Sequence, residues 1–161
     1  MNVTLRTRTP AETRRLGERI GRMLQPGDVV LLSGELGAGK TVLAQGLGRG
    51  LGVDDAIKSS SFVIMNEYEG ARARLYHADL YRLEDPAQVV ELALDELAAN
   101  GVLVVEWPER AMEDLPPEHL LVRLEYGTGN ERVIEVEGRG ERYDAIVRRL
   151  ERRQRHGRRS A

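Results

Sequence analysis

The sequence predicts an α/β domain with a mostly parallel central sheet flanked by helices and a C-terminal β-hairpin and helix. Two continuous hydrophobic runs, Val29–Leu32 and Val102–Val105, are typical of strands buried on both faces. Segments with strand-like and helical spacing of apolar residues alternate around these runs, which is the pattern of an α/β fold. The chain has 161 residues, a length that suits one domain with its own core.

The first half of the chain predicts two strands and two helices. Asn2–Thr7 alternates apolar and polar residues and predicts a short strand. A helix should begin at Thr9 and Pro10, because threonine can cap a helix and proline suits its first turn. The turn residues Pro26-Gly27 end it. Next come a strand over Asp28–Ser33, a glycine-rich loop and a helix from Lys40 to about Leu51.

The second half predicts further strands, one internal helix, the hairpin and a last helix. The segments are strands Phe62–Tyr68 and Arg74–Tyr81, a helix Pro86–Leu97, a strand Val102–Val105, hairpin strands Leu120–Glu125 and Arg132–Glu137, and a helix Glu141–Arg153. We expect a domain over residues 1–150 and a basic, disordered tail over residues 151–161. The arginines near this end are either solvated or contact a partner protein or tRNA, since phosphate binding needs clustered cations.

Charge and composition exclude several classes of protein. The net charge of −2 argues against a chain that binds nucleic acid through its overall charge. The absence of cysteine excludes a disulfide framework and a cysteine-ligated zinc site. No segment has the apolar length of a signal peptide or a membrane span. We therefore expect a cytoplasmic protein with no membrane partner and no DNA partner.

The glycine-rich loop carries the strongest functional signal. Gly34–Thr41 reads GELGAGKT and matches the phosphate-binding (P-loop) pattern G-x-x-x-x-G-K-[ST], between a buried strand and a helix. Glycines let the main chain approach a phosphate, and the following helix directs its positive end toward the anion. Lys40 would reach the β- and γ-phosphates, and the Thr41 hydroxyl would bind Mg²⁺. The motif predicts a P-loop NTPase domain with ATP and Mg²⁺ as ligands, and the lack of an Asn-Lys-x-Asp sequence favours adenine over guanine.

A P-loop also needs a carboxylate near its metal ion, and two residues are candidates. Glu106 follows Val102–Val105 at the carboxyl end of a buried strand, where ligands bind in open α/β sheets. Asp79 ends a less apolar segment. We favour Glu106 as the magnesium ligand, direct or through water, over a solvated strand-end glutamate. His77 and Asp79 would share a strand face, so they could form a hydrogen-bonded pair that either orients the attacking water or is purely structural.

Further segments accompany the loop in a fixed order: Lys58–Phe62 (KSSSF), Asn66–Tyr68 (NEY), His77–Leu83 (HADLYRL) and Val105–Arg110 (VEWPER). Together they resemble the bacterial TsaE family, formerly YjeE, from about Thr9 to Arg132. The resemblance implies a compact P-loop α/β fold and a small ATPase for threonylcarbamoyladenosine modification of tRNA. It also implies slow hydrolysis alone, and joint action with the TsaB and TsaD proteins at adenosine 37 of tRNAs that read codons beginning with A. The ATPase would reset that assembly, with any contact to tRNA itself left open.

The resemblance assigns roles to individual residues. Thr41 and Glu106 would hold Mg²⁺, and hydrolysis would require Asp79 together with Lys40 and Glu106. Further nucleotide contacts would come from the helix start, Pro10 to Thr13, and from Arg132. The residues that would wrap the phosphates are Leu36, Gly37, Ala38, Gly39, Lys40 and Thr41.

The sequence departs from the family pattern at one segment, and two other functions are possible. The family's Ser-Pro-Thr-Phe is SSSF at Ser59–Phe62, so this segment is either a switch over the γ-phosphate that lacks a stiffening proline or an ordinary polar loop. The chain could also be a small-molecule P-loop kinase, although no lid-like insertion is evident. The remaining alternative is a nucleotide-gated binding module without significant turnover.

Overall fold

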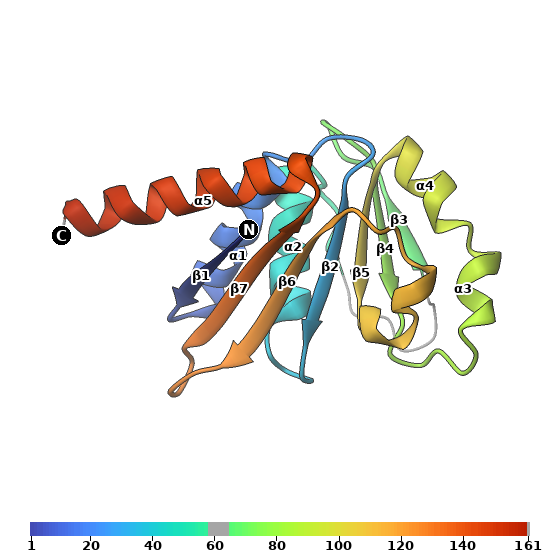
Figure 1. Cartoon of the computed structure of the whole chain (residues 1–161), viewed down its shortest axis with the longest axis horizontal. Helices are drawn as coiled ribbons and strands as arrows, with labels where there is room; N and C mark the ends of the chain where they lie inside the picture. Colours follow the sequence, from blue (N-terminus) through green and yellow to red (C-terminus); the bar gives the residue numbers. More distant parts are fainter. Residues whose placement is uncertain (58–64, 161) are drawn as a thin grey trace.

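The computed structural model describes residues 1–57 and 65–160, and its centre is a seven-stranded sheet with helices on both faces (Figure 1). The strand order is β1-β7-β6-β2-β5-β4-β3. The strands are β1 (Asn2–Thr7), β2 (Val29–Gly34), β3 (Met65–Tyr68), β4 (Leu75–Asp79), β5 (Val102–Glu106), β6 (His119–Tyr126) and β7 (Arg132–Arg139).

The sheet is parallel only at its centre. The neighbours β6, β2, β5 and β4 run parallel, whereas the pairs β1–β7, β7–β6 and β4–β3 are antiparallel. The prediction of a mostly parallel sheet is therefore wrong at both margins. A short connection between neighbouring strands forces them antiparallel, and this applies to β6–β7 and to β3–β4. The mixed sheet keeps the parallel strands that carry the loop in the middle of the molecule.

Helices cover the two faces unequally. The helices α1 (Pro10–Gly21), α2 (Lys40–Gly50) and α5 (Glu141–Arg159) pack on one face with Val30 and Leu32 of β2. The short helices α3 (Ala87–Glu91) and α4 (Leu94–Asn100) contribute to the core on the other face, with Val29 and Leu31. Alternating residues of β2 thus enter different cores, as expected for a strand buried on both faces. Two 3₁₀ turns, Pro108–Arg110 and Met112–Asp114, follow β5.

Helices α1 and α2 approach each other closely because both carry glycine at the contact. A Cβ added to Gly17 would lie only 3.0 Å from the Cα of Gly46 and 3.1 Å from the main-chain nitrogen of Leu47. Any larger side chain at Gly17 would force the helices apart. This contact fixes the position of α1 relative to α2, and hence relative to the loop that precedes α2.

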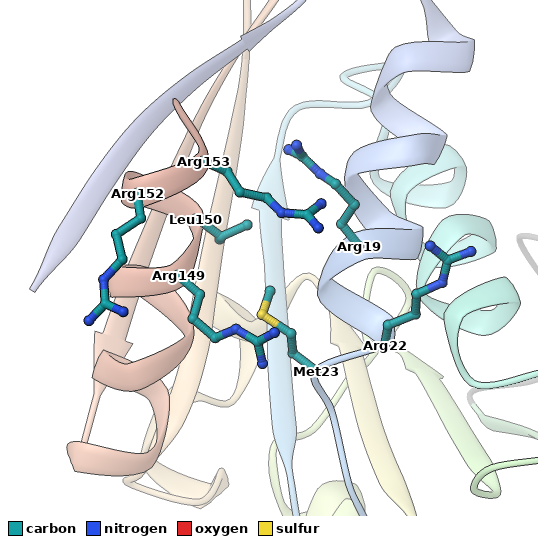
Figure 2. Close-up of a pocket in the computed structure, with 7 residues that line it drawn as sticks. All are labelled: Arg19, Arg22, Met23, Arg149, Leu150, Arg152 and Arg153. Atoms are coloured by element: carbon teal, nitrogen blue, oxygen red, sulfur yellow. The ribbon is translucent and has the colours of Figure 1, made fainter. Parts of the chain in front are cut away.

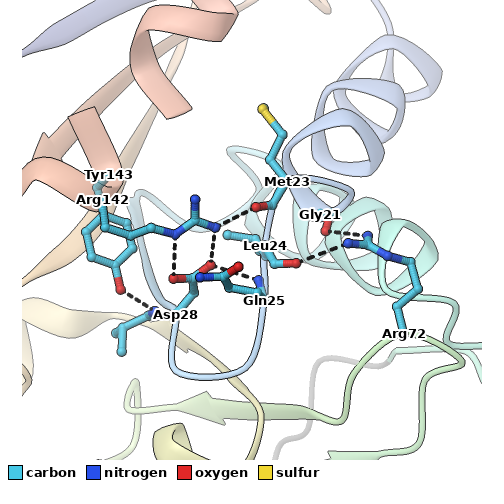
Figure 3. Close-up of polar contacts among 9 residues, drawn as sticks. Gly21, Met23, Leu24, Gln25, Asp28, Arg72, Arg142 and Tyr143 are labelled. Carbon is cyan, nitrogen blue, oxygen red and sulfur yellow. Dashed lines mark hydrogen bonds and ion pairs between the residues drawn. The ribbon is translucent and has the colours of Figure 1, made fainter. Parts of the chain in front are cut away.

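Two arginines fasten the end of α1 and the start of β2 to the rest of the chain (Figure 3). Arg142 of α5 forms two hydrogen bonds to the Asp28 carboxylate, at 3.1 and 2.8 Å, and a third to the carbonyl of Met23 at 2.6 Å. Arg72 donates to the carbonyls of Gly21 and Leu24 at 3.2 Å each. Both guanidinium groups therefore satisfy main-chain or carboxylate acceptors within the fold.

Two predicted helices differ from the structure. The predicted helix Pro86–Leu97 is interrupted at Ala93, which has a φ of 49° and separates α3 from α4. Val89 and Leu94 are five positions apart, so a continuous helix would turn them to different sides, and the break lets both enter the same core. None of the helices in the described ranges has the length and hydropathy needed to cross a bilayer.

The predicted disordered tail is also wrong for most of its length. The helix α5 continues past Arg153 to Arg159. Arginine has a high helix propensity, and no glycine or proline interrupts this stretch before Gly157. Gln154 also donates a hydrogen bond of 2.9 Å to the carbonyl of Thr4 in β1, which holds the start of this extension against the sheet.

Candidate functional site

The glycine-rich loop connects β2 to α2 at the carboxyl end of the central strand. Gly37 and Gly39 have φ angles of 78° and 105°, which favour glycine strongly over any residue with a Cβ. A Cβ at Gly37 would also lie 2.7 Å from the Tyr126 hydroxyl oxygen. Gly39 caps α2 without a side-chain hydrogen bond, so the first main-chain N–H groups of α2 are left for another acceptor. This geometry suits an anion.

Lys40 is buried at the start of α2, inside this loop. Its ammonium donates to the carbonyl oxygens of Gly34 and Glu35, the second at 3.0 Å, and lies 3.9 Å from the centre of the Trp107 ring. No carboxylate among the described residues lies within ion-pair distance of it. Burial lowers the pKa of Lys40, against the opposing attraction of Glu106 and other nearby carboxylates. A phosphate in the loop would supply the charged acceptor that this ammonium lacks.

Glu106 ends β5 and is hydrogen-bonded to His77 on the adjacent strand. The distance from His77 Nε2 to Glu106 Oε2 is 2.6 Å, and each residue is only 2% exposed. His77 therefore pairs with Glu106 and not with Asp79, the partner that the sequence had suggested as one possibility. In the parallel register His77 lies opposite Val104, and Glu106 stands two residues further along on the same face. Knowing that β4 and β5 are adjacent would have identified this pair.

Asp79 lies directly opposite Glu106 in the register of β4 and β5. One carboxylate oxygen of Asp79 accepts a hydrogen bond of 3.0 Å from the main-chain N–H of Tyr81. Burial raises the pKa of Asp79, and the neighbouring charge of Glu106 raises that pKa further. Two carboxylates at adjacent strand ends, close to a buried ammonium, form an environment in which a divalent cation would relieve charge repulsion.

Protein ligands alone do not complete a metal site here. Across residues 1–57 and 65–160, no group of three or more His, Asp or Glu side chains could hold a metal ion. Mg²⁺ commonly uses one or two protein ligands and takes the rest from phosphates and water. Thr41, in the first turn of α2, and Glu106, at the end of β5 and close to Lys40, are two oxygen donors that could meet that requirement.

The hairpin of β6 and β7 contacts the glycine-rich loop through two side chains. The Tyr126 hydroxyl donates to the carbonyl of Leu36, and Arg132 Nε donates to the carbonyl of Ala38 at 3.2 Å. The Arg132 guanidinium also lies 4.6 Å from the centre of the Tyr126 ring. Arg132 was expected near the nucleotide from the resemblance, and it contacts the loop. Tyr126 was missed, because nothing in its local sequence shows that the hairpin returns to the loop.

The start of α1 forms another border of the loop. Thr9 caps this helix, since its hydroxyl accepts from the Glu12 N–H, and Pro10 is the first helical residue. Thr13 is buried, and its methyl group is 3.8 Å from the position that a Cβ on Gly39 would take. The Thr13 hydroxyl lies 2.7 Å from that of Thr7 rather than facing the loop.

Trp107, directly after β5, contacts side chains of both the loop and the segment that follows β4. Its φ of 57° is unusual for a residue with a side chain. In this conformation its ring contacts the Tyr81 ring at a tilt of 46°, with 4.9 Å between centroids, and lies under the Lys40 ammonium. Leu36, by contrast, is 62% exposed at the tip of the loop. The segment Ser59–Phe62 lies outside the described residues, so its predicted role as a switch stays a prediction.

These features define a mixed α/β, single-sheet domain in which a glycine-rich loop holds a buried lysine beside two strand-end carboxylates. The family model for "Threonylcarbamoyl adenosine biosynthesis protein TsaE" matches residues 7–134. The chain therefore belongs to the TsaE family, and the resemblance seen in the sequence is confirmed.

Similar proteins cover nearly the whole chain. The tRNA threonylcarbamoyladenosine biosynthesis protein TsaE from Bacillus subtilis is 38% identical, over 91% of this chain and 92% of its own length. The protein of that name from Streptomyces coelicolor is 43% identical, over 81% of this chain and 93% of its own length. The crystal structure of Bacillus subtilis YdiB superimposes with a TM-score of 0.80 at 34% identity, covering 96% of this chain and 97% of YdiB.

Proposed function

We propose that this protein binds and hydrolyses ATP with Mg²⁺, as the subunit that supports formation of N6-threonylcarbamoyladenosine at position 37 of tRNAs reading codons that begin with A. It would act in the cytoplasm with TsaB and TsaD. One observation carries the proposal: a buried ammonium, that of Lys40, lies within a turn of glycines at the start of α2, and no carboxylate of residues 1–57 and 65–160 pairs with it. The names of the family and of its relatives support the tRNA modification.

The loop would bind the triphosphate through its main chain. Residues Leu36–Thr41 would surround the phosphates with N–H groups, and Lys40 would exchange its carbonyl partners for the β- and γ-phosphate oxygens. Such an exchange is favourable because a phosphate carries the negative charge that a carbonyl lacks. Pro10, Thr13 and Arg132, which border or approach the loop, would form the remaining nucleotide contacts.

The strand ends would provide the chemistry. Thr41 and Glu106 would hold Mg²⁺, which when bound neutralises charge on the phosphate oxygens. His77, hydrogen-bonded to Glu106, would fix the orientation of that carboxylate. Asp79 has one oxygen occupied by the Tyr81 N–H, and its carboxylate could still accept a hydrogen bond from the attacking water.

The Lys40→Ala variant tests the site. It should abolish hydrolysis and greatly weaken nucleotide binding, because it removes the only ammonium in the loop. Binding can be followed through Trp107, the single tryptophan, whose emission should change when Lys40 moves from its ring to a phosphate. Phosphate release should be measured with the protein alone and with TsaB and TsaD.

The control for this experiment is Arg139→Ala. Arg139 is an exposed cation near the end of β7, paired with Glu137 at 3.4 Å, and it belongs to none of the proposed contacts. It should bind and hydrolyse ATP as the unchanged protein does. If Mg-ATP neither alters Trp107 emission nor yields phosphate with the partners present, the proposed function is wrong.

A further inference from the structure

A pocket of about 290 Å³ lies between α1 and α5, at the end of α1 remote from the glycine-rich loop (Figure 2). Figure 2 shows Arg149 and Arg153 extending from α5 toward α1, and Arg19 extending from α1 toward α5. Like charges from two helices thus converge on one pocket. Its lining residues are Arg19, Arg22, Met23, Arg149, Leu150, Arg152 and Arg153.

The converging arginines lack acceptors. Within residues 1–57 and 65–160, Arg19, Arg149 and Arg153 form neither an ion pair nor a side-chain hydrogen bond, and the same holds for Arg152 at the rim. The Arg19 Nε atom is buried without a hydrogen-bond partner. Burial lowers the pKa of Arg19, and the charge of Arg153 lowers it further. A guanidinium remains charged in spite of this, so the pocket concentrates uncompensated positive charge.

The arginines that build the fold are arranged differently. Arg142, on the same helix α5, forms an ion pair with Asp28, and Arg72 donates to main-chain carbonyls (Figure 3). Their guanidinium groups are satisfied without any ligand. Within the described residues Arg19, Arg149 and Arg153 have no such acceptors, whereas Arg22 at the edge of the pocket is ion-paired with Glu18 at 2.7 Å. The mutual repulsion of the unpaired arginines costs stability. Their arrangement therefore suits the binding of an anion more than the support of the fold.

The positive charge continues along α5 beyond the pocket. Arg152 lies at the pocket rim. It also belongs to a row of arginines spaced three or four residues apart, so that they lie along one side of the helix as a stripe. The row spans about 16 Å at the rise of an α-helix. It extends along the last turns of α5, which pass beyond β1 (Figure 1). Its members are Arg148, Arg152, Arg155 and Arg159, of which Arg155 is ion-paired with Glu151 at 2.9 Å.

We propose that the α1–α5 pocket and the adjoining stripe bind consecutive phosphate groups of a tRNA backbone. Guanidinium groups match phosphate oxygens with two parallel hydrogen bonds, which an unpaired arginine can form at once. A single small anion would use the pocket alone, whereas a phosphodiester backbone uses the pocket and the stripe together. The choice of tRNA among nucleic acids rests on the proposed function. The site is separate from the glycine-rich loop, so tRNA and ATP would bind at different ends of α1.

Two double variants of equal charge test this site. Arg149→Glu with Arg153→Glu changes two arginines that enter the pocket from α5. Arg15→Glu with Arg158→Glu changes one arginine on each of α1 and α5, and neither residue lines the pocket. Binding of a tRNA transcript to the full chain should be measured by fluorescence anisotropy over a range of salt concentrations. The pocket variant should bind tRNA at least about tenfold more weakly. The slope of its log affinity against log salt concentration should fall by the equivalent of about two phosphate contacts. The tRNA affinity of the control variant should change by less than about threefold.

Stability gives an independent readout. Arg153→Glu alone should raise the midpoint of thermal unfolding, because it replaces repulsion with attraction toward Arg19, and yet it should weaken tRNA binding. Equal losses of affinity in both double variants would indicate unspecific attraction to α5 and would overturn the proposal. The pocket double variant could instead keep its tRNA affinity and lose the stimulation of hydrolysis by TsaB and TsaD. That result would indicate that the pocket binds an acidic protein surface, and it would also overturn the proposal.

The proposed function can fail separately from this inference. Both double variants should hydrolyse ATP at the rate of the unchanged protein when assayed alone, because their substitutions lie outside the loop. If the unchanged protein shows no hydrolysis but its tRNA affinity still depends on Arg149 and Arg153, the ATPase proposal is wrong and the phosphate-binding pocket is retained.

Discussion

At the residue scale, the pair of His77 and Glu106 combines burial with a short hydrogen bond of 2.6 Å. His77→Ala would leave the Glu106 carboxylate buried without its partner. We expect a loss of about 1–3 kcal/mol in the free energy of unfolding, the usual cost of an unsatisfied buried polar group, together with slower ATP hydrolysis. Urea unfolding and phosphate release measure the two effects.

His119→Ala provides the matched control for this variant. His119 is also buried, and its Nδ1 hydrogen-bonds the carbonyl of Pro116 at 2.8 Å, on a part of β6 away from the loop. Its replacement should reduce stability and leave hydrolysis per folded molecule unchanged. If both variants hydrolyse ATP at the same rate, His77 is only a structural residue.

Asp79 makes stability depend on pH in a predictable direction. Burial raises the pKa of its carboxyl group in the folded protein, so the unfolded chain releases this proton first, from about pH 4 upward. Between that pH and the raised pKa the folded state binds more protons, and stability therefore falls as pH rises. Asp79→Asn removes this ionisation and should raise the melting temperature at pH 7 while abolishing hydrolysis.

The same variant should lose its advantage in acid, because Asp79 is then neutral in both the folded and unfolded states. Melting temperatures recorded from pH 3 to pH 8 test this, with Asp54→Asn as an exposed control outside the site. An Asp79→Asn protein that is no more stable than the unchanged protein at pH 7 would contradict this account of the partly buried carboxylate.

At the scale of elements, the β6–β7 hairpin supports the loop between β2 and α2. Tyr126→Phe removes the hydrogen bond to the Leu36 carbonyl but keeps the ring on which Arg132 stacks. We expect ATP to bind a few-fold more weakly, since the loop loses one constraint and must be ordered on binding. Titration of Trp107 emission measures this, and Tyr68→Phe in β3 serves as the control. Equal affinities in the two variants would show that the hairpin does not order the loop.

The elements also show which parts of the fold the sequence can predict. Hydrophobic runs and cap residues predicted β2, β5 and the start of α1, because these signals are local. The antiparallel hairpin of β6 and β7 was expected from the sequence, but the pairing of β1 with β7 was not, since it joins segments far apart in the chain. The helix break at Ala93 likewise depends on which core receives Val89 and Leu94.

The residues of the candidate site were likewise predicted only in part. The glycine-rich loop and the two carboxylates were found from sequence, because a motif and the ends of apolar runs mark them. The partner of Glu106 and the contribution of Tyr126 were not, since both depend on which strands are neighbours. The arginines of the α1–α5 pocket were noticed only as a basic end of the chain, because the pocket requires the packing of α5 beside α1.

At the scale of the whole molecule, the glycine contact between α1 and α2 has a mechanical consequence. Gly17 and Gly46 bring the two helices into main-chain contact, so we expect a shift of one helix to move the other. A movement of the first turn of α2, when a phosphate arrives or departs, would therefore displace both ends of α1, including the rim at Arg19. By thermodynamic reciprocity, an RNA held there would alter the affinity for nucleotide by the same factor as nucleotide alters the affinity for RNA.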